Sequence, residues 1–456
     1  MLNPIIYIKN KVKILGLPEV SITKISQFLT ISNPLWQRGL SLGLTNWGIP
    51  KQLQYYEDVT DNSIVVPVGS LNDVLQILLE DCIFTQKDIV DNRKSKKLEE
   101  YFSKINFKAT LRDYQQEMLD ACNNKTIGVI QAKTGAGKTL FALSLMLEKK
   151  EPTLFLVNTL ELANQAIESF SKHTNLTPDG IGFIGNGKFS LKPITVGLHQ
   201  TMARLSEEQM GMLNEHVGMV IADEVHICPA KTYYNTLVSL DAKYKWGISA
   251  TPRREDGLTR AIFFATGPLI YSVPESKLED ILIKPSVEVI NTNYTFPLFS
   301  TQDYQPMITD LSENTARNKL IIDKAKKYKG KAMVLLCSRV AQVEALKEGL
   351  GDQAVTLTSD VSKKIRKKVM EQLHAKEKNI IISTYGLFST GIDIPHLEVL
   401  LLCAPIKSEV KLRQAAGRLM RKAPGKKSAV IIDFIDSQVG LLFNQSRKRT
   451  RILSNL

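Results

Sequence analysis

Short apolar runs alternate with helix-forming stretches along the chain from about residue 108 to the C-terminal end. Most of these runs are continuous, as expected for strands of a parallel sheet whose two faces are both covered by helices. Two such series predict an α/β fold with two parallel-sheet domains in tandem. The expected strands are residues 126–130, 153–157, 194–198, 219–222 and 245–248 in the first series, and 332–336, 354–357, 379–383, 399–403 and 429–432 in the second.

The first 104 residues lack this strand–helix rhythm. They combine strand-like segments at 5–8 and 63–68 with a helical stretch at 71–79, so we expect a small N-terminal α+β accessory domain. The proline-containing segment 275–320 is expected to cross between the two α/β domains. A chain of 456 residues is long enough for three domains, which we expect at 1–104, 105–275 and 276–456.

The composition is that of an ordinary globular protein, with 43% apolar and 23% charged residues. The five cysteines are scattered without a Cys-x-x-Cys pair, which argues against a disulfide framework or a zinc module. Lys9, Lys11 and Lys13 interrupt the first apolar residues, and no apolar stretch reaches the roughly 18 residues of a membrane span. We therefore expect a soluble cytoplasmic protein.

Positive charge is concentrated in the last third of the chain. The net charge is +13, and residues 321–456 hold 26 lysines and arginines against 12 aspartates and glutamates. Such a concentration indicates a polyanion as partner, with a solvated basic face as the alternative. Lipid headgroups would attract the same charges, but no amphipathic membrane face accompanies them. The basic cluster at 363–368 is expected on a helix, and the one at 447–451 is expected to trail off the fold.

A glycine-rich segment at 129–139, Val-Ile-Gln-Ala-Lys-Thr-Gly-Ala-Gly-Lys-Thr, lies between an expected strand and an expected helix. Backbone N–H groups of such a loop, at the positive end of a helix, cradle the β-phosphate of a nucleotide. Lys138 would reach the β- and γ-phosphates, and the Thr139 hydroxyl would ligate Mg²⁺. The alternative is a glycine-rich turn with an incidental lysine. The expected cradle consists of Ala132, where the strict pattern has glycine, and of Lys133, Thr134, Gly135, Ala136 and Gly137.

An acidic pair follows the expected strand at 219–222. Asp223 and Glu224 would lie at the carboxyl edge of the sheet, where open α/β sheets bind ligands. Asp223 would hold the Mg²⁺, and Glu224 would orient and deprotonate the attacking water. An acidic pair at a strand end also occurs by chance. The pair stands 85 residues after Lys138 and in the expected strand–helix order, which favours the functional interpretation.

Arg418 and Arg421 stand three positions apart in Gln-Ala-Ala-Gly-Arg-Leu-Met-Arg, and we expect them on one face of a helix. The functional interpretation is a pair of arginine fingers that stabilise charge on the γ-phosphate. Arginine suits this role because its planar guanidinium can donate two hydrogen bonds to phosphate oxygens. The alternative is ordinary surface charge.

Together and in this order, these segments resemble the superfamily 2 helicases over roughly residues 108–436. The resemblance implies two tandem RecA-like domains. It also implies that Gln115 in Leu-Arg-Asp-Tyr-Gln senses adenine, and that Gly391 and Asp393 in the turn at 390–395 belong to the nucleotide site. Other matching segments are 157–165 and 197–201, which resemble nucleic-acid contact motifs, 223–226 and 249–251, which match motifs II and III, and 414–421, which matches motif VI.

Asp-Glu-Val-His at 223–226 and the later Arg254-Glu255-Asp256 resemble the XPB/Rad25 and phage UvsW branch. This resemblance implies an ATP- and Mg²⁺-dependent DNA helicase or translocase for branched or forked DNA, active in replication, recombination or repair. It also implies association with the nucleoid, in the host cell cytoplasm if the chain comes from a phage. ATP would sit between the two α/β domains. The alternatives are an RNA helicase of the Asp-Glu-x-His type and a DNA-binding protein with an inactive ATPase. A restriction translocase is disfavoured because residues 1–104 show no nuclease-like set of carboxylates and lysine.

Four aromatic residues of the N-terminal segment remain open to two interpretations. They could stack on an unpaired base at a DNA fork, or they could fill a small core. The residues are Trp36, Trp47, Tyr55 and Tyr56.

Overall fold

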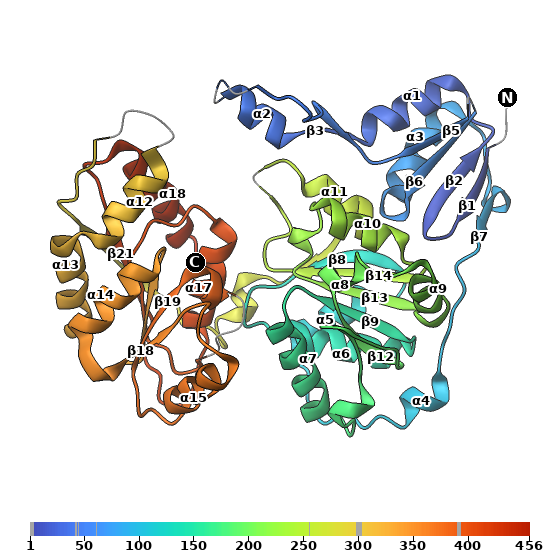
Figure 1. Ribbon diagram of the computed structural model, residues 1–456. Helices are drawn as coiled ribbons and strands as arrows, with labels where there is room; N and C mark the ends of the chain where they lie inside the picture. Colours follow the sequence, from blue (N-terminus) through green and yellow to red (C-terminus); the bar gives the residue numbers. More distant parts are fainter. Residues whose placement is uncertain are drawn as a thin grey trace. The chain divides into compact units, whose positions relative to one another are not determined.

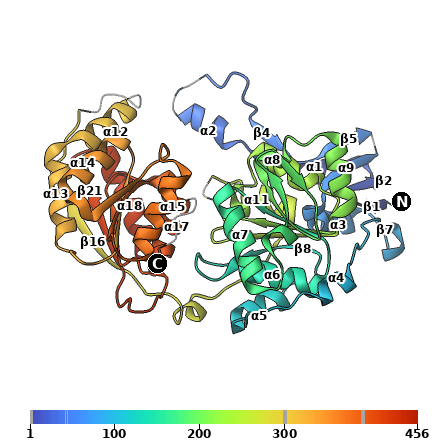
Figure 2. The same ribbon diagram turned by 60° about the horizontal axis from the view of Figure 1, so that its bottom comes forward.

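The computed structural model describes residues 4–41, 43, 45–60, 62–254, 256–297, 303–389 and 394–456 (Figure 1). Contacts divide the chain into two compact units. The first contains residues 1–273 except 134–136, and the second contains the remainder. Figure 2 shows the same elements from a second direction.

The first unit contains an eight-stranded sheet with the order β11-β10-β12-β9-β13-β14-β8-β15. All neighbours are parallel except the hairpin of β10 and β11. The carboxyl ends of the central strands therefore meet at one edge, where α/β sheets bind ligands. The strands are β8 (Ile127–Gln131), β9 (Thr153–Val157), β10 (Gly182–Gly185), β11 (Lys188–Ser190), β12 (Ile194–Leu198), β13 (Met219–Asp223), β14 (Tyr244–Ser249) and β15 (Leu269–Ser272).

Helices pack around this sheet, and local sequence signals fix where several of them begin. Thr159 accepts a hydrogen bond from the backbone N–H of Leu162, and Ser206 forms a capping box with Gln209. The helices are α5 (Asp113–Asp120), α6 (Lys138–Lys149), α7 (Leu160–His173), α8 (His199–Met202), α9 (Glu207–His216), α10 (Lys231–Ser239) and α11 (Thr259–Thr266).

The N-terminal part of the first unit forms a mixed five-stranded sheet with the order β5-β6-β2-β1-β7. Helices α1 and α3 complete its core. Strands β3 and β4 pair with each other, and α2 belongs to the segment that connects them in the sequence. The elements are β1 (Ile5–Ile8), β2 (Lys11–Leu15), α1 (Glu19–Phe28), β3 (Thr30–Ser32), α2 (Pro34–Ser41), β4 (Gln52–Gln54), β5 (Glu57–Thr60), β6 (Ser63–Pro67), α3 (Leu71–Asp81), β7 (Ile89–Asp91) and the connecting α4 (Glu99–Ser103).

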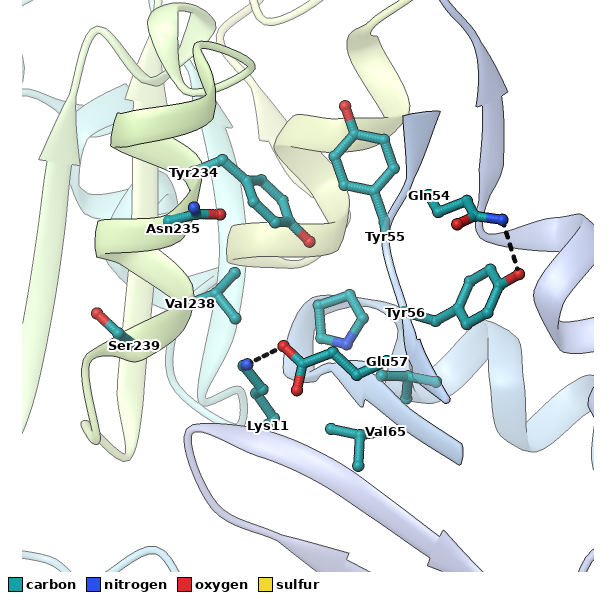
Figure 3. A pocket seen from close by; sticks show the side chains of 12 residues that line it. Lys11, Gln54, Tyr55, Tyr56, Glu57, Val65, Tyr234, Asn235, Val238 and Ser239 are labelled. Carbon is teal, nitrogen blue, oxygen red and sulfur yellow. Dashed lines mark hydrogen bonds and ion pairs between the residues drawn. The ribbon is translucent and has the colours of Figure 1, made fainter. Parts of the chain in front are cut away.

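An aromatic seam joins this N-terminal sheet to α10 and α11. The ring of Tyr55 meets Tyr234 edge-on at 4.9 Å between centroids and lies 5.5 Å from Phe264. Phe28 lies 5.7 Å from Phe264. Figure 3 shows Tyr55 and Tyr234 beside a groove of about 460 Å³ that also borders Tyr56. Tyr55 and Tyr56 pack against the N-terminal core, so for these two residues the core interpretation holds.

The second unit is built on a six-stranded, fully parallel sheet with the order β16-β21-β20-β17-β19-β18. Its strands are β16 (Ser286–Asn291), β17 (Met333–Cys337), β18 (Ala354–Leu357), β19 (Ile380–Thr384), β20 (Val399–Leu402) and β21 (Val430–Ile435). Its helices are α12 (Tyr304–Glu313), α13 (Thr315–Lys326), α14 (Val340–Leu350), α15 (Lys363–His374), α16 (Tyr385–Ser389), α17 (Glu409–Met420) and α18 (Gly440–Leu453).

Two expectations about the second unit are wrong. The segment 275–320 is not merely a crossing, because it supplies the edge strand β16 and the helices α12 and α13. The basic cluster at 447–451 does not trail off the fold, because it lies in α18. Arg449 is 3% exposed and forms an ion pair with the buried carboxylate of Asp433 at 2.9 Å.

The fold class expected from the sequence is confirmed, with two RecA-like parallel-sheet layers and an N-terminal α+β portion. The basic cluster at 363–368 lies on α15, as expected. Within the described parts of the chain, no helix has both the length and the apolar character needed to cross a membrane.

Candidate active site

The glycine-rich segment forms the turn between β8 and α6. Gly135 and Gly137 have φ angles of +94° and +75°, in the left-handed region that side chains disfavour. A Cβ atom on Gly137 would lie only 2.4 Å from the amide nitrogen of Gln115. The glycines therefore let the backbone turn tightly into the N-terminus of α6, as a phosphate cradle requires.

The other residues of the predicted phosphate cradle lie in or beside this turn. Ala132 is buried, and its N–H donates to the carbonyl of Ser249 at 3.0 Å, which joins the loop to β14. Lys138 and Thr139 open α6 and are half-buried. The half-buried Lys133 and Thr134 and the buried Ala136 lie in the connecting turn.

Gln115 lies on α5 beside the loop and is 2% exposed. Its Nε2 is 3.5 Å from the carbonyl oxygen of Gly137, and its Oε1 accepts from the backbone N–H of Arg112 at 2.9 Å. The structure thus brings Gln115 to the loop. Its predicted role toward adenine stays a prediction.

Asp223 ends β13, and Glu224 leaves the strand with a left-handed backbone conformation (φ 50°, ψ 47°). A non-glycine residue in this region is uncommon, and such strained conformations cluster at functional sites. The turn directs Glu224 toward α6, where its Oε1 forms an ion pair with the ammonium group of Lys138. Residues from the two motifs, predicted separately from the sequence, are therefore in direct contact.

The two neighbouring carboxylates have opposite pKa shifts. Burial raises the pKa of Asp223, and the nearby charge of Glu224 adds to this, against the opposing charge of Lys138. For Glu224 burial also acts upward, but the charge of Lys138 and the hydrogen bond with His226 outweigh it and lower the pKa. Glu224 is therefore held as a carboxylate. A cation that approaches Asp223 would stabilise its ionised form and lower its raised pKa.

His226 and Ser249 extend the site. From the sequence, the hydroxyls at 249–251 were expected to relay the phosphate state toward the bound nucleic acid, and His226 had no role of its own. Nδ1 of His226 lies 3.1 Å from Oε2 of Glu224 and 3.0 Å from the hydroxyl of Ser249. The same hydroxyl accepts from the backbone N–H of Thr251 at 3.1 Å. The sequence signal that could have indicated this contact is the histidine at the fourth position of Asp-Glu-Val-His. In the structure this histidine is only 5% exposed.

Arg254 supports the same turn from the segment after β14. Its Nη1 donates to the backbone carbonyl of His226 at 2.5 Å, and its Nε donates to Asp256 at 2.9 Å. Arg254 thus joins the segment that follows β14 to the turn that carries Glu224.

The predicted arginine pair lies in the second unit, at the end of α17. Arg418 is in the helix and donates to the carbonyl of Phe388. The expectation that both arginines share a helical face is wrong, because α17 ends at Met420. Arg421 is extended and forms an isolated antiparallel bridge with Leu282. Gly391 and Asp393 lie outside the described residues.

The donor groups in the first unit fit a nucleotide with a divalent cation. The loop presents the N-terminus of α6, Lys138 supplies a cation, and Asp223 has a raised pKa that a metal ion would relieve. The described residues contain no preformed cluster of three or more His, Cys, Asp or Glu side chains that could hold a metal by itself. A metal here would therefore share its coordination with phosphate oxygens, as Mg²⁺ commonly does.

Two family models match the chain at these elements. Residues 108–254 match the res subunit of type III restriction enzymes, and residues 314–423 match the helicase conserved C-terminal domain. The first match contains the loop and the acidic pair, and the second contains both arginines. The chain belongs to the superfamily 2 helicases. The resemblance stated from the sequence is thereby confirmed, and this helicase is an ATP-dependent enzyme.

Relatives in sequence agree with this assignment, and a solved structure shares the fold. The DNA 3'-5' translocase XPB2 of Sulfurisphaera tokodaii is 25% identical over 406 residues, covering 80% of this helicase and 88% of that protein. A putative ATP-dependent RNA helicase of Acanthamoeba polyphaga mimivirus is 27% identical, covering 76% and 68%. A fragment of a putative type I restriction HsdR subunit from Vibrio vulnificus shares the fold with a TM-score of 0.57 at 18% identity, covering 93% and 80%.

Proposed function

We propose that this helicase acts on DNA, and that its substrate is branched or forked DNA, which it remodels by branch migration. The observation that carries the DNA assignment is the similarity to a DNA 3'-5' translocase over 80% of the chain, together with the intact Lys138–Glu224 pair. The preference for branched DNA rests on the resemblance to the XPB/Rad25 and UvsW branch at Asp-Glu-Val-His and Arg254.

The distribution of charge supports a polyanionic partner. The excess of lysine and arginine lies in residues 321–456, and α15 carries five of these side chains within six positions. Contacts of this kind are made mainly to phosphates, so binding should be largely independent of sequence and should weaken with salt. RNA carries the same phosphates, and one relative is named as an RNA helicase, so RNA is the second candidate substrate.

Each predicted site residue has a proposed role in ATP hydrolysis. Lys138 binds the β- and γ-phosphates, and the loop N–H groups of residues 132–137 hold the β-phosphate. The hydroxyl of Thr139 and the carboxylate of Asp223 hold Mg²⁺, which when bound neutralises charge on the phosphates. Glu224 orients the attacking water and accepts its proton, since its lowered pKa keeps it ionised.

The second unit and the N-terminal portion have proposed roles as well. Arg418 and Arg421 stabilise the charge that develops on the γ-phosphate during turnover. Gln115 contacts the adenine, and Gly391 and Asp393 help to bind the nucleotide. We propose that residues 1–104, 105–275 and 276–456 act as three functional domains, and we assign junction recognition to the first.

A four-way junction with one labelled strand tests the proposed substrate. Incubation with ATP and Mg²⁺ should convert it to two forked duplexes, and the Glu224→Gln variant should leave it intact at the same protein concentration. A matched RNA duplex serves as the comparison. Unwinding of the RNA with no action on the junction would overturn the proposal and establish the RNA alternative.

A further inference from the structure

The segment 30–54, here called the arm, extends away from the five-stranded N-terminal sheet (Figure 1). Its two ends meet at the aromatic seam, where the backbone N–H of Tyr55 donates to the carbonyl of Leu29 at 3.0 Å. The guanidinium of Arg260 on α11 donates to the carbonyl of Phe28 and lies 4.5 Å over its ring. The base of the arm is therefore fixed to helices of the first unit, which also carries Lys138 and Glu224.

The described residues of the arm are held together by their own hydrogen bonds. The side chain of Asn33 is buried, donates to the carbonyl of Pro50 at 2.8 Å and accepts from the N–H of Leu35 at 3.0 Å. The amide of Asn46 donates to the carbonyl of Trp36 at 3.0 Å. These bonds link the two halves of the arm and keep its residues in defined positions.

The arm exposes an unusual amount of apolar surface. Trp47 is 96% exposed, the largest value among the exposed large apolar side chains that the structure describes, and Leu35 and Leu40 are 63% and 62% exposed. A tryptophan left in water forgoes the free energy that burial of its apolar surface would supply, and several exposed apolar side chains on one short segment are typical of an interaction surface.

The charge around these side chains points to the chemistry of that partner. No aspartate or glutamate occurs between Glu19 and Glu57, and the arm carries the exposed cations Arg38 and Lys51. The ammonium of Lys51 lies 5.5 Å over the ring of Trp36. An exposed aromatic side chain on a segment that carries cations and no carboxylate matches a nucleic acid, which offers base faces next to phosphates.

We propose that the arm is a stacking element that engages an unpaired base where duplex DNA opens, with Trp47 as the side chain that stacks. This inference rests on the proposed action on branched DNA and assigns its recognition to a specific surface. It also separates three of the N-terminal aromatic residues: Trp47 contacts DNA, whereas Tyr55 and Tyr56 pack against the core. Because the base of the arm is fixed to the first unit, an engaged base would be held relative to the ATPase residues of that unit.

The chain contains three tryptophans, so tryptophan fluorescence can measure the contact directly. Trp246 is fully buried in β14, so solutes and bases do not reach it. In a Trp36→Phe variant the emission that DNA can alter comes from Trp47. We expect a fork with unpaired arms to quench this emission and to protect it from acrylamide, and blunt duplex of equal length to do neither.

Trp47→Ala should weaken fork affinity by about 5- to 150-fold, the range for loss of one base–aromatic stack, with duplex affinity unchanged. The matched control is Leu79→Ala, an apolar side chain of α3 that is 57% exposed outside the arm. Both side chains are exposed, so neither change threatens folding. The two substitutions should therefore differ only at the fork.

Three results would overturn the inference. The first is equal protection of Trp47 by fork and blunt duplex, and the second is unchanged fork affinity of Trp47→Ala. The third is protection that appears without DNA as protein concentration rises, which would make the arm a contact between copies of the chain. DNA-stimulated ATP hydrolysis reports on the proposed function separately. Stimulation without Trp47 protection refutes the arm alone, whereas no stimulation by any DNA refutes the proposed function.

Discussion

Lys138 and Glu224 are 86 positions apart in the sequence and form a direct ion pair at the end of β13. The side chain predicted to bind phosphate thus neutralises the side chain predicted to act as the base. A phosphate at the loop would compete for the ammonium of Lys138, and Glu224 would then be left with His226 as its partner. The proposed roles would therefore link nucleotide binding to release of the base through one lysine.

Glu224→Gln should abolish turnover and preserve ATP binding, because glutamine keeps the shape and loses the basic oxygen. We expect kcat to fall by about 10²- to 10⁴-fold, the range for loss of a general base. Steady-state hydrolysis and nucleotide binding, measured on one preparation, check this. The matched control is Glu207→Gln on the exposed first turn of α9. Native-rate hydrolysis by Glu224→Gln would remove Glu224 from the role of base.

Arg421→Ala should lower kcat by on the order of 10³-fold while leaving KM for ATP nearly unchanged, because an arginine finger acts on transition-state charge. Arg413→Ala is the control, since Arg413 lies on α17, which ends directly before Arg421, and pairs with Glu409 at 2.7 Å. A loss below about threefold would assign Arg421 to structure, and Arg418 would then be the remaining candidate.

Lys245 predicts a pH dependence of stability. Burial lowers the pKa of its ammonium from 10.5 to about 7, and Nζ donates to the carbonyl of Leu237 at 3.1 Å. Between these pKa values the unfolded chain binds more protons than the folded one, so this group makes stability rise with pH across that window. Below about pH 7 the cost of burying the cation is present in full.

Lys245→Met should therefore stabilise the protein most at pH 6, by a few kcal/mol, and progressively less toward pH 10. Urea unfolding at several pH values measures this, with Lys188→Met on the exposed edge strand β11 as the control. A stability gain that grows with pH would contradict the assignment.

The buried pair of Arg449 and Asp433 predicts that α18 is part of the second unit's core. Arg449→Leu leaves a buried carboxylate unpaired and should cost about 3–5 kcal/mol of unfolding free energy. Adding Asp433→Leu should restore most of it, because the unpaired charge is then removed. If Arg449→Leu behaves like a surface substitution, with a change below about 0.5 kcal/mol, the helix contributes little to the core.

The sequence predicted the central strands well because each is a continuous apolar run. The expected 153–157 and 194–198 coincide with β9 and β12, and the expected 354–357 coincides with β18 at the edge of the second sheet. The edge strand β16 escaped prediction because its side chains are mostly exposed, with Val287 at 36% and Val289 at 47%. Without a buried face, no continuous apolar run marks a strand.

Side-chain pairing was less predictable than strand position. The ion pair of Arg449 depends on the packing of α18 against β21, and the basic run around it resembles a solvated tail. The contact of His226 with Ser249 links positions 23 apart that meet only when β13 and β14 pair. The aromatic residues of the N-terminal portion were ambiguous for the same reason, since exposure separates Trp47 from Tyr55 only in the fold.

We propose that a DNA branch stimulates ATP hydrolysis by this helicase. The most direct measurement is the initial rate of ATP hydrolysis at one salt concentration with single-stranded DNA, blunt duplex, fork, four-way junction and RNA of equal nucleotide content, with Glu224→Gln as the blank. We expect the highest rates with fork and junction, lower rates with the other DNAs, and the least stimulation with RNA. Equal rates on all DNAs, or the highest rate with RNA, would contradict it.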